Sequence, residues 1–503
     1  MIKSLSLHSF LFGLVLLSTA APSASALAAP EVSGGNSSKG EQVAMAPMAA
    51  GDEAPRDQTV AKPAKKPGAA KSAPSIWLVI PFILMLLAIA ILPLTLEHFW
   101  ESNLNKLIIA LVLGVPIAIY FGVTGTVNQH YLTHTLFEYV AFMCLLGSLY
   151  VISGGILLKG DLTPSPTVNT GFLALGAVLA SFMGTTGAAM LLIRPVISIN
   201  TRRKHRVHTV IFFTFLVANI GGLLTPLGDP PLFMGYLRGV PFTWTFGLLP
   251  QWAALVGTLL GVYFIWDSIL WKRDTEAQEA FRKATEREPL SLSGTVNFPL
   301  LAGVVLCVAF GAKFPILIGS SAAGFTVREV AMIGLAIVSW LATSKKVRSD
   351  NEFTFHPIIE VAALFLGIFL TMIPAVALLQ VRGGDLGVTE PWQFFWATGA
   401  LSSFLDNTPT YVVFFSLAGG DLSLFDSSLT STLVAGVPEK ILVAISLGAV
   451  FMGANTYIGN GPNFMVKAIA DERGIRMPSF FGYMFYAFII LVPLFVVFTF
   501  VWF

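Results

Sequence analysis

Apolar stretches that are long enough to cross a bilayer recur along this chain from Ile76 to its end. A transmembrane helix needs about 20 predominantly apolar residues, because lipid satisfies no backbone hydrogen bond. Charged residues make up 12% of the 503 residues, about half the share found in a soluble domain. The sequence therefore predicts an all-α polytopic membrane protein. Its uninterrupted spans are 76–96, 107–124, 137–158, 246–271, 295–312, 326–343, 357–380 and 479–502.

The first 75 residues differ in composition from the rest of the chain. Residues 1–28 have the features of a signal segment: a basic start at Lys3, a short apolar stretch and a small-residue site ending at Ala28. Cleavage after Ala28 and retention as an uncleaved first helix both remain open. Residues 29–75 are rich in Ala, Pro, Gly, Ser and Lys, which predicts a disordered linker outside the cytoplasm. The membrane domain is then 76–503.

Four further apolar stretches are interrupted by polar residues, glycine and proline: 171–193, 209–237, 393–418 and 438–468. Lys and Arg crowd the loops after 171–193, 246–271, 326–343 and 438–468, which predicts a cytoplasmic location for these loops. The loops 381–392 and 419–437 hold one Arg between them and are placed outside, as is the C-terminus.

These loop locations are consistent with one another only if two of the interrupted stretches do not cross the inner or plasma membrane. Stretches 171–193 and 393–418 must be re-entrant hairpins of two half-length limbs, which face opposite ways. Stretches 209–237 and 438–468 must cross as helices with a break. The chain then has two re-entrant hairpins and two broken transmembrane helices.

The hairpins resemble each other in sequence, and so do the broken stretches. LASFMGTTG at 179–187 aligns with LSSFLDNTP at 401–409. GDPPLFM at 228–234 aligns with GNGPNFM at 459–465, and Thr225 then aligns with Thr456. Two motifs in the same order and in opposite orientation indicate an inverted repeat, with copies at about 107–271 and 295–503. Inverted repeats with discontinuous helices are the architecture of secondary transporters.

The helix breaks supply groups that bind ions. A break frees carbonyls, which suit Na⁺, and N–H groups, which suit an anion. Asp229 and Asp406 are the strongest candidates, because an ionisable group at mid-membrane costs about 2.5–3.5 kcal/mol and is functional by default. Each could instead be a structural N-cap. The other candidates for transport or ion binding are Thr185, Thr186, Asn219, Thr225, Gly228, Asn407, Thr408, Asn455, Thr456, Asn460 and Asn463.

A Na⁺ site is expected at Thr186, Asp229, Asp406 and Asn455, and Na⁺ or H⁺ is the expected coupling ion. Catalytic residues and an organic cofactor are not expected. Three acidic residues lie nearer the span ends and are expected at the membrane interface: Glu138, Asp267 and Glu360. Glu360 could alternatively join a proton path. His130 and His134 are placed in an outer loop, where no metal site is expected because Cys and carboxylate partners are missing. His205 and His208 lie in a basic cytoplasmic loop and are expected to be solvated.

At these motifs the chain resembles the ion transporter superfamily, which includes citrate transporters, D-type sodium:proton antiporters, arsenite permeases and divalent anion:sodium symporters. The resemblance covers about 76–503 and is carried by NIGG at 219–222, GAAM at 187–190, TPLGDPP at 225–231 and DNTPT at 406–410. It implies a scaffold domain, a transport domain with elevator-like movement, and a homodimer. Two departures are the Thr185-Thr186 tip, where many relatives carry Asn or Asp, and the absence of the symporters' Ser-Asn-Thr tip.

Three classes of function remain to be separated. A cation-coupled secondary transporter is favoured, and within that class two core carboxylates without a core Arg favour a sodium:proton antiporter. The alternative is a Na⁺- or H⁺-coupled carrier of citrate or another small anion. An intramembrane aspartyl protease would use two Asp as an acid–base pair. Its Gly-x-Gly-Asp motif is absent, because Pro226 stands two residues before Gly228. A passive channel would need a repeated filter motif. The expected partners are membrane lipid, a small ion or carboxylate and a second copy of the chain, and the net charge of +2 gives no basis for nucleic-acid binding.

Overall fold

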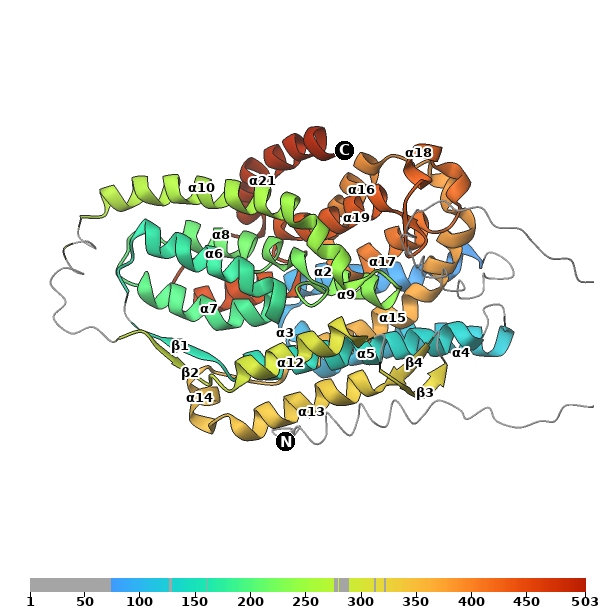
Figure 1. The fold of residues 1–503 in the computed structure, drawn as a ribbon, viewed down its shortest axis with the longest axis horizontal. Coiled ribbons are helices and arrows are strands. Elements are labelled where there is room, and N and C mark those ends of the chain that lie inside the picture. The colour runs from blue at the N-terminus through green and yellow to red at the C-terminus, as the bar shows by residue number, and fades with distance from the viewer. Residues whose placement is uncertain are drawn as a thin grey trace, which may run out of the picture. The chain divides into compact units, whose positions relative to one another are not determined.

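Helices dominate the computed structural model of this protein, and most of them run along one common direction (Figure 1). The structure describes residues 74–125, 129–160, 162–275, 279, 289–311, 314–320 and 323–503. The predicted signal segment 1–28 and nearly all of the linker 29–75 lie outside these residues. Eight helices of the described part are long and apolar enough to cross a membrane. The prediction of an all-α polytopic membrane protein is confirmed.

The first half of the membrane domain ends with α10. Its helices are η1 (Ile76–Val79), α2 (Ile80–Thr95), α3 (Glu97–Trp100), α4 (Asn103–Thr124), α5 (Gln129–Ser153), α6 (Pro166–Met183), α7 (Thr185–Ile199), α8 (Val207–Leu216), η2 (Ile220–Leu224), α9 (Pro230–Leu237), η3 (Phe242–Leu248) and α10 (Leu249–Arg273).

The second half begins with α12. Its helices are α12 (Asn297–Ala309), α13 (Val327–Ala342), α14 (Lys345–Asp350), α15 (His356–Arg382), η5 (Gly383–Leu386), α16 (Pro391–Phe404), α17 (Asn407–Ala418), η6 (Leu422–Leu424), α18 (Ser427–Thr430), α19 (Glu439–Met452), η7 (Gly453–Asn455), α20 (Gly461–Glu472) and α21 (Phe480–Trp502). Within the described residues, three antiparallel strand pairs accompany the helices: β1 (Leu157–Lys159) with β2 (Ser291–Ser293), β3 (Ile316–Ser320) with β4 (Ala323–Thr326), and β5 (Leu433–Val434) with β6 (Val437–Pro438).

All four interrupted stretches are discontinuous, as predicted. Helices α6 and α7 meet at Gly184, whose φ of +80° favours glycine. Helices α16 and α17 meet at 405–406. Residues 225–229 separate η2 from α9, and 456–460 separate η7 from α20. Helix α6 is longer than the predicted half-length limb, since its 18 residues rise about 27 Å.

The two repeats join hairpin to broken helix by matching hydrogen bonds. In the first repeat, the Ser181 hydroxyl donates to the carbonyl of Gly221, and the Thr225 hydroxyl donates back to the carbonyl of Ser181. In the second, the Ser403 hydroxyl donates to the carbonyl of Met452, and the Thr456 hydroxyl donates back to the carbonyl of Ser403. These bonds satisfy polar groups at both breaks, and their repetition supports the alignment of the two motifs.

Close backbone contact makes two glycines essential to the broken helices, one in each. A Cβ atom on Gly228 would lie 2.1 Å from the carbonyl oxygen of Gly222. A Cβ atom on Gly459 would lie 2.5 Å from the carbonyl oxygen of Gly453. Both spacings are far below van der Waals contact. The glycines in the aligned motifs therefore let the chain fold back on itself at the break.

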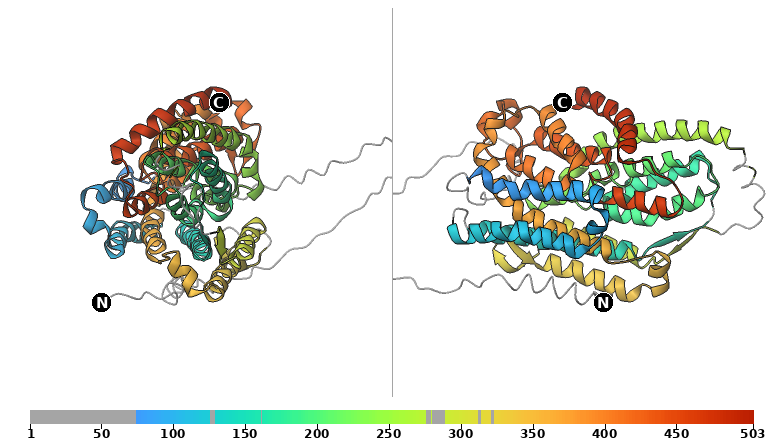
Figure 2. Two further views of the ribbon diagram at one scale, coloured as in Figure 1. Left: turned by 90° about the vertical axis from the view of Figure 1, so that its left-hand side faces the viewer. Right: turned by 180° about the vertical axis from the view of Figure 1, so that it is seen from behind.

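The broken helices lie inside the bundle and the long apolar helices lie around them. Nearly all of the segment 207–224 is buried, whereas α2, α4, α10 and α21 expose most of their apolar side chains. Figure 2 shows α2 and α4 on the outer face of the bundle when it is viewed from behind. Because apolar surface of this extent is stable only against lipid or another protein, these helices form the perimeter.

Three predicted elements differ from the structure. Helix α5 begins at Gln129, so His130 and His134 belong to a helix and not to an outer loop. Helices α12 and α13 have 13 and 16 residues, too few for the full spans predicted at 295–312 and 326–343. The apolar run of 295–312 continues into the β3–β4 pair, and apolar composition alone does not distinguish a helix from a strand.

Candidate functional site

One buried carboxylate gathers all four discontinuous segments. Asp229 is fully buried just before α9. Its Oδ1 accepts hydrogen bonds from Thr185 Oγ1 at the tip of the first hairpin (3.2 Å) and from Asn460 Nδ2 at the second broken helix (3.1 Å). Its Oδ2 accepts a hydrogen bond from Asn407 Nδ2 at the tip of the second hairpin (2.6 Å). All three of these donors are neutral side chains.

The four residues form two pairs related by the repeat. Asp229 and Asn460 occupy equivalent positions before α9 and α20, and Thr185 and Asn407 occupy the first positions of α7 and α17. The repeat therefore brings equivalent residues together from opposite halves of the chain. Asp229 is the one member of the four with an acidic side chain.

The two aspartates differ in a way that the sequence does not predict. Asp229 stands at the N-cap position of α9, but its side chain makes no capping hydrogen bond. Asp406 does cap its helix, since its Oδ1 accepts the backbone N–H of Thr408 (2.9 Å). Asn460 repeats the behaviour of Asp229 at the start of α20. At the starts of α9 and α20, the N-cap side chains therefore bond to each other and not to the backbone of their own helix. We call Thr185, Asp229, Asn407 and Asn460 the central cluster.

A cavity of about 80 Å³ lies beside this cluster. Its lining includes five residues that the sequence predicts for the site: Thr185, Thr186, Gly228, Asp406 and Asn460. The opposite side comes from α5 and α15, which contribute Leu146, Leu149, Tyr150, Pro357, Ile358, Val361 and Phe365. The cavity thus has one polar side, made of helix breaks, and one apolar side. Small-molecule sites typically occupy roughly 300–1,000 Å³, so the space would have to widen to admit a tricarboxylate.

Three further site candidates, Asn219, Asn455 and Asn463, belong to a buried hydrogen-bond network. The amide of Asn219 donates to Asn463 Oδ1 (2.7 Å), and Asn463 donates to the carbonyls of Gly453 and Thr456 (2.9 Å each). The amide of Asn455 donates to Ser403 Oγ (3.0 Å). Among the described residues, the side-chain oxygens of Asn219 and Asn455 lack a hydrogen-bond donor.

The four residues expected to form one Na⁺ site stand in different hydrogen-bonding surroundings, and the Na⁺ site stays a prediction. Thr186 and Asp406 line the cavity, Asp229 lies beside it, and Asn455 belongs to the network around Ser403. Within the described residues there is also no group of three or more His, Cys, Asp or Glu side chains that could hold a metal ion. Oxygen ligands for Na⁺ would have to include neutral hydroxyls, amides or backbone carbonyls.

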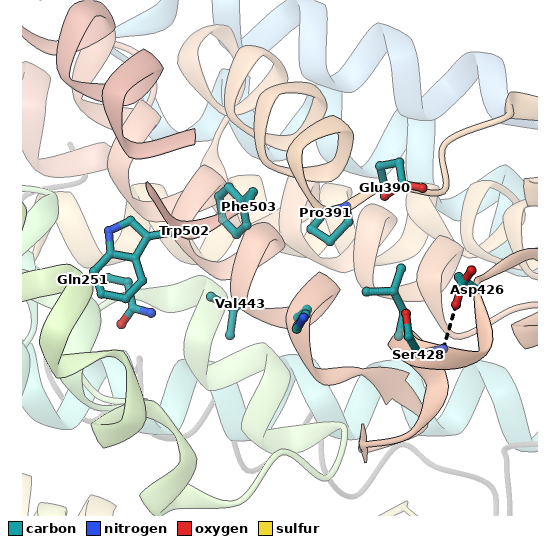
Figure 3. A pocket seen from close by; sticks show the side chains of 10 residues that line it. Gln251, Glu390, Pro391, Asp426, Ser428, Val443, Trp502 and Phe503 are labelled. Carbon is teal, nitrogen blue, oxygen red and sulfur yellow. Dashed lines mark hydrogen bonds between the residues drawn. The ribbon is translucent and has the colours of Figure 1, made fainter. Parts of the chain in front are cut away.

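A second, larger cavity of about 440 Å³ lies away from the helix breaks (Figure 3). It is lined by the ends of α10, α16, α18, α19 and α21, and includes Gln251, Glu390, Asp426, Lys440 and Trp502. None of the sequence-predicted site residues lines it. We therefore place the functional site at the smaller cavity, because the convergent polar groups are there.

Sequence reasoning missed two buried ion clusters. Asp267 is fully buried and pairs with Arg203 (2.6 Å) and His208 (2.8 Å), so His208 is not solvated, contrary to the expectation. Glu138 is also buried and pairs with Arg238 (3.0 Å). Glu360, expected at the interface, is about one-third exposed and pairs with Lys106 (2.7 Å). The partners in each pair lie 59 to 254 residues apart in sequence, a separation at which a local motif gives no signal.

Comparison with known proteins gives the site its context. A protein family described as "Putative citrate transport" matches residues 71–503. A protein of Synechocystis sp. that is named as an uncharacterized transporter is 23% identical over 389 residues, which cover 71% of this chain and 79% of that protein. The family match spans both hairpins, both broken helices and the cavity between them. The chain is thus a multi-pass membrane transport protein, not an enzyme, and it belongs to the citrate transport family.

Proposed function

We propose that the protein is a cation-coupled secondary transporter of a small carboxylate of the citrate type. Asp406 carries this proposal, because it is an acidic side chain on the cavity wall and lies at a helix break. A carboxylate at such a place either takes a proton or binds a cation. Family membership supports the choice of a citrate-type cargo. The expected location is the inner or plasma membrane.

The two aspartates have different roles in this proposal. Asp229 accepts from three side-chain donors and is not among the residues that line the cavity, so it holds the four discontinuous segments in register. Asp406 lines the cavity and is the group that Na⁺ or H⁺ reaches. The cargo binds next to it, against the hydroxyl of Thr186 and the first turn of α20, where Gly461 lines the cavity.

Sodium:proton exchange is the second candidate, and the composition of the cavity wall favours it. Pro230 and Pro231 occupy the first turn of α9, which removes two backbone N–H groups that an anion could use. No Lys or Arg is among the described residues that line the smaller cavity. A citrate ion would therefore be held by few donors, whereas a cation would meet carboxylate, hydroxyl and amide oxygens.

Proteoliposomes that report both cargo and proton movement separate the two candidates. We would measure radiolabelled citrate uptake under an imposed Na⁺ or pH gradient, and internal pH with a trapped dye in the same vesicles. The proposal expects gradient-driven citrate uptake that Asp406→Asn reduces about a hundredfold, a loss that corresponds to about 2.7 kcal/mol. Ser423→Ala, an exposed change outside the cavity, is the matched control.

Three results would contradict carboxylate transport. Na⁺-driven proton movement without citrate uptake would make exchange the main function. Equal uptake by Asp406→Asn and the unchanged protein would show that Asp406 is only a cap. Citrate flux that neither saturates nor responds to a cation gradient would indicate a channel.

A further inference from the structure

The smaller cavity lies between two parts of the bundle that are joined by ion pairs on both sides of it. We call the helices α7, α9, α17 and α20, which meet at the breaks, the core. We call α5 and the first half of α15 the wall. Along α5, Glu138 comes near the start, the cavity residues Leu146 and Tyr150 follow, and the helix ends at Ser153. Contacts at Glu138 and beyond Ser153 therefore bracket the cavity.

The first of these contacts centres on Glu352, in the loop before α15. Its Oε2 lies 3.1 Å from Arg194 NH2 on α7, and its Oε1 lies 2.7 Å from Arg473 NH2 at the end of α20. The carboxylate of Glu352, in the loop next to the wall, thus binds one arginine from each repeat. Glu352 has a φ of +51°, a left-handed conformation that is uncommon for residues other than glycine and clusters at functional sites.

The loop that carries Glu352 is fixed firmly to the wall. The buried amide of Asn351 donates to the carbonyls of Gly154 (3.0 Å) and Ile156 (3.2 Å), just beyond α5. Arg348 donates to the carbonyl of Val151 (2.8 Å). Glu352 is therefore held in place from the wall side, while its carboxylate, about half exposed, meets the core arginines through charge. Such a contact can form and break without repacking apolar side chains.

The second contact lies on the other side of the cavity. Glu138 Oε2 on α5 accepts from Arg238 NH2, which follows α9, at 3.0 Å. Both side chains are largely buried, at 7% and 15% exposed. His134 Nδ1 lies 3.7 Å from the other oxygen of Glu138. This pair also joins wall to core, one partner being on α5 and the other at the end of a broken helix.

We propose that the Glu352–Arg194/Arg473 contact and the Glu138–Arg238 contact are the two gates of the cavity, each closing it toward one side of the membrane. The cavity has a wall side and a core side, and ion pairs join these two sides at both ends of the cavity. Opening one contact lets wall and core separate at that end while the other end stays closed. The role of these contacts as gates rests on the proposed transport function, but access to the cavity can be measured without transport.

Side-specific labelling of one cavity cysteine tests the gates. Cys144 and Cys307 are the two cysteines of the chain, and replacing both by Ala gives a cysteine-free background. Leu146→Cys then places a thiol in the cavity wall, away from the polar site. A membrane-impermeant maleimide is applied from either side, in sealed cells and in inverted vesicles. The exposed variants Lys346→Cys and Ser423→Cys report which side of the membrane each end of the bundle faces.

The expected result is an asymmetric change in labelling rate. Glu352→Gln should raise labelling about three- to tenfold from the side of Lys346, the magnitude of one or two ion pairs, and leave the other side unchanged. Glu138→Gln should raise labelling from the opposite side of the membrane and leave the side of Lys346 unchanged. Arg473→Gln should resemble Glu352→Gln, and the exchange Glu138→Arg with Arg238→Glu should restore the original rate.

Asp350→Asn is the matched control for Glu352→Gln. Asp350 lies two residues away and is also acidic, and the hydrogen bond from Lys159 (2.8 Å) lowers the pKa of its carboxyl. Its partner Lys159 belongs to β1 and not to the core, so labelling should not change. Faster labelling from both sides in Glu352→Gln would indicate general loosening, and no change from either side would show that the contact does not close the cavity. Either result overturns the gates even if citrate uptake is observed.

Discussion

At the scale of single residues, the site depends on one buried carboxyl group among neutral donors. Asp229 receives hydrogen bonds from Thr185, Asn407 and Asn460, one from each other discontinuous segment. A buried polar group is costly unless it is hydrogen-bonded, and each such hydrogen bond contributes about 0.5–1.5 kcal/mol. The cluster is therefore stable only while all three donors are present, which makes it sensitive to any movement of the four breaks.

Asp229→Asn should abolish transport while the protein still enters the membrane. The new amide group would direct N–H donors at Asn407 or Asn460, so at least one of the former hydrogen bonds is lost, at a cost of about 1–3 kcal/mol. Transport and thermal stability in detergent would be measured together. The exchange Asp229→Asn with Asn460→Asp should recover part of the activity, because it moves the carboxyl group to the equivalent position in the same cluster. Full activity of the single variant would show that the carboxyl group is dispensable.

The sequence predicts the members of this cluster but not their pairing. Asp229, Asn407 and Asn460 are candidates because lipid does not solvate a polar side chain at a break in an apolar run, so each must bind a partner or a ligand there. Which aspartate caps its helix cannot be predicted, because Asp229 and Asp406 both precede a half-helix. The answer depends on donors more than 170 residues away in sequence, at Asn407 and Asn460.

At the scale of helices and strands, each broken helix depends on a glycine that allows two backbone segments to touch. Gly228→Ala should destabilise the protein by roughly 2–3 kcal/mol or more, since the new Cβ would overlap the carbonyl of Gly222 and neither backbone can yield. Thermal unfolding in detergent measures this loss. Gly261→Ala, in the continuous helix α10 with no atom near the new Cβ, is the control and should change little. Equal unfolding temperatures would refute the role of the close contact.

Most helices are predictable from the sequence, and the lengths of α12 and α13 differ from the prediction for one reason. Long apolar runs, and the Gly and Pro residues that interrupt them, predict α4, α15, both hairpins and both broken helices. The runs at 295–312 and 326–343 are apolar enough to predict full spans, but they form short helices next to the β3–β4 pair. Hydropathy indicates that a segment lies in an apolar environment, but it does not give the length of the helix. The lengths of α12 and α13 are set by tertiary packing.

At the scale of the whole molecule, the way the second hairpin enters the membrane decides the topology. Lys346 lies before α15 and Ser423 lies after α17, and both are exposed. If α15 crosses once and the α16–α17 hairpin returns to its own side, the two positions must face opposite sides. Lys346→Cys and Ser423→Cys should then react with an impermeant maleimide from opposite sides. Reaction from the same side would mean that the second hairpin crosses the membrane.

The meeting of both repeats at Asp229 also has a consequence for how the chain is made. Translation completes the first hairpin and the first broken helix long before Asn407 and Asn460 exist. During that interval Asp229 has only Thr185 of its three side-chain donors. The first half must therefore enter the membrane with its carboxylate incompletely satisfied, held by the insertion machinery or by water until the second half arrives. Two separately expressed halves, divided between α10 and α12, would each be short-lived alone and would protect each other from degradation when they are produced together.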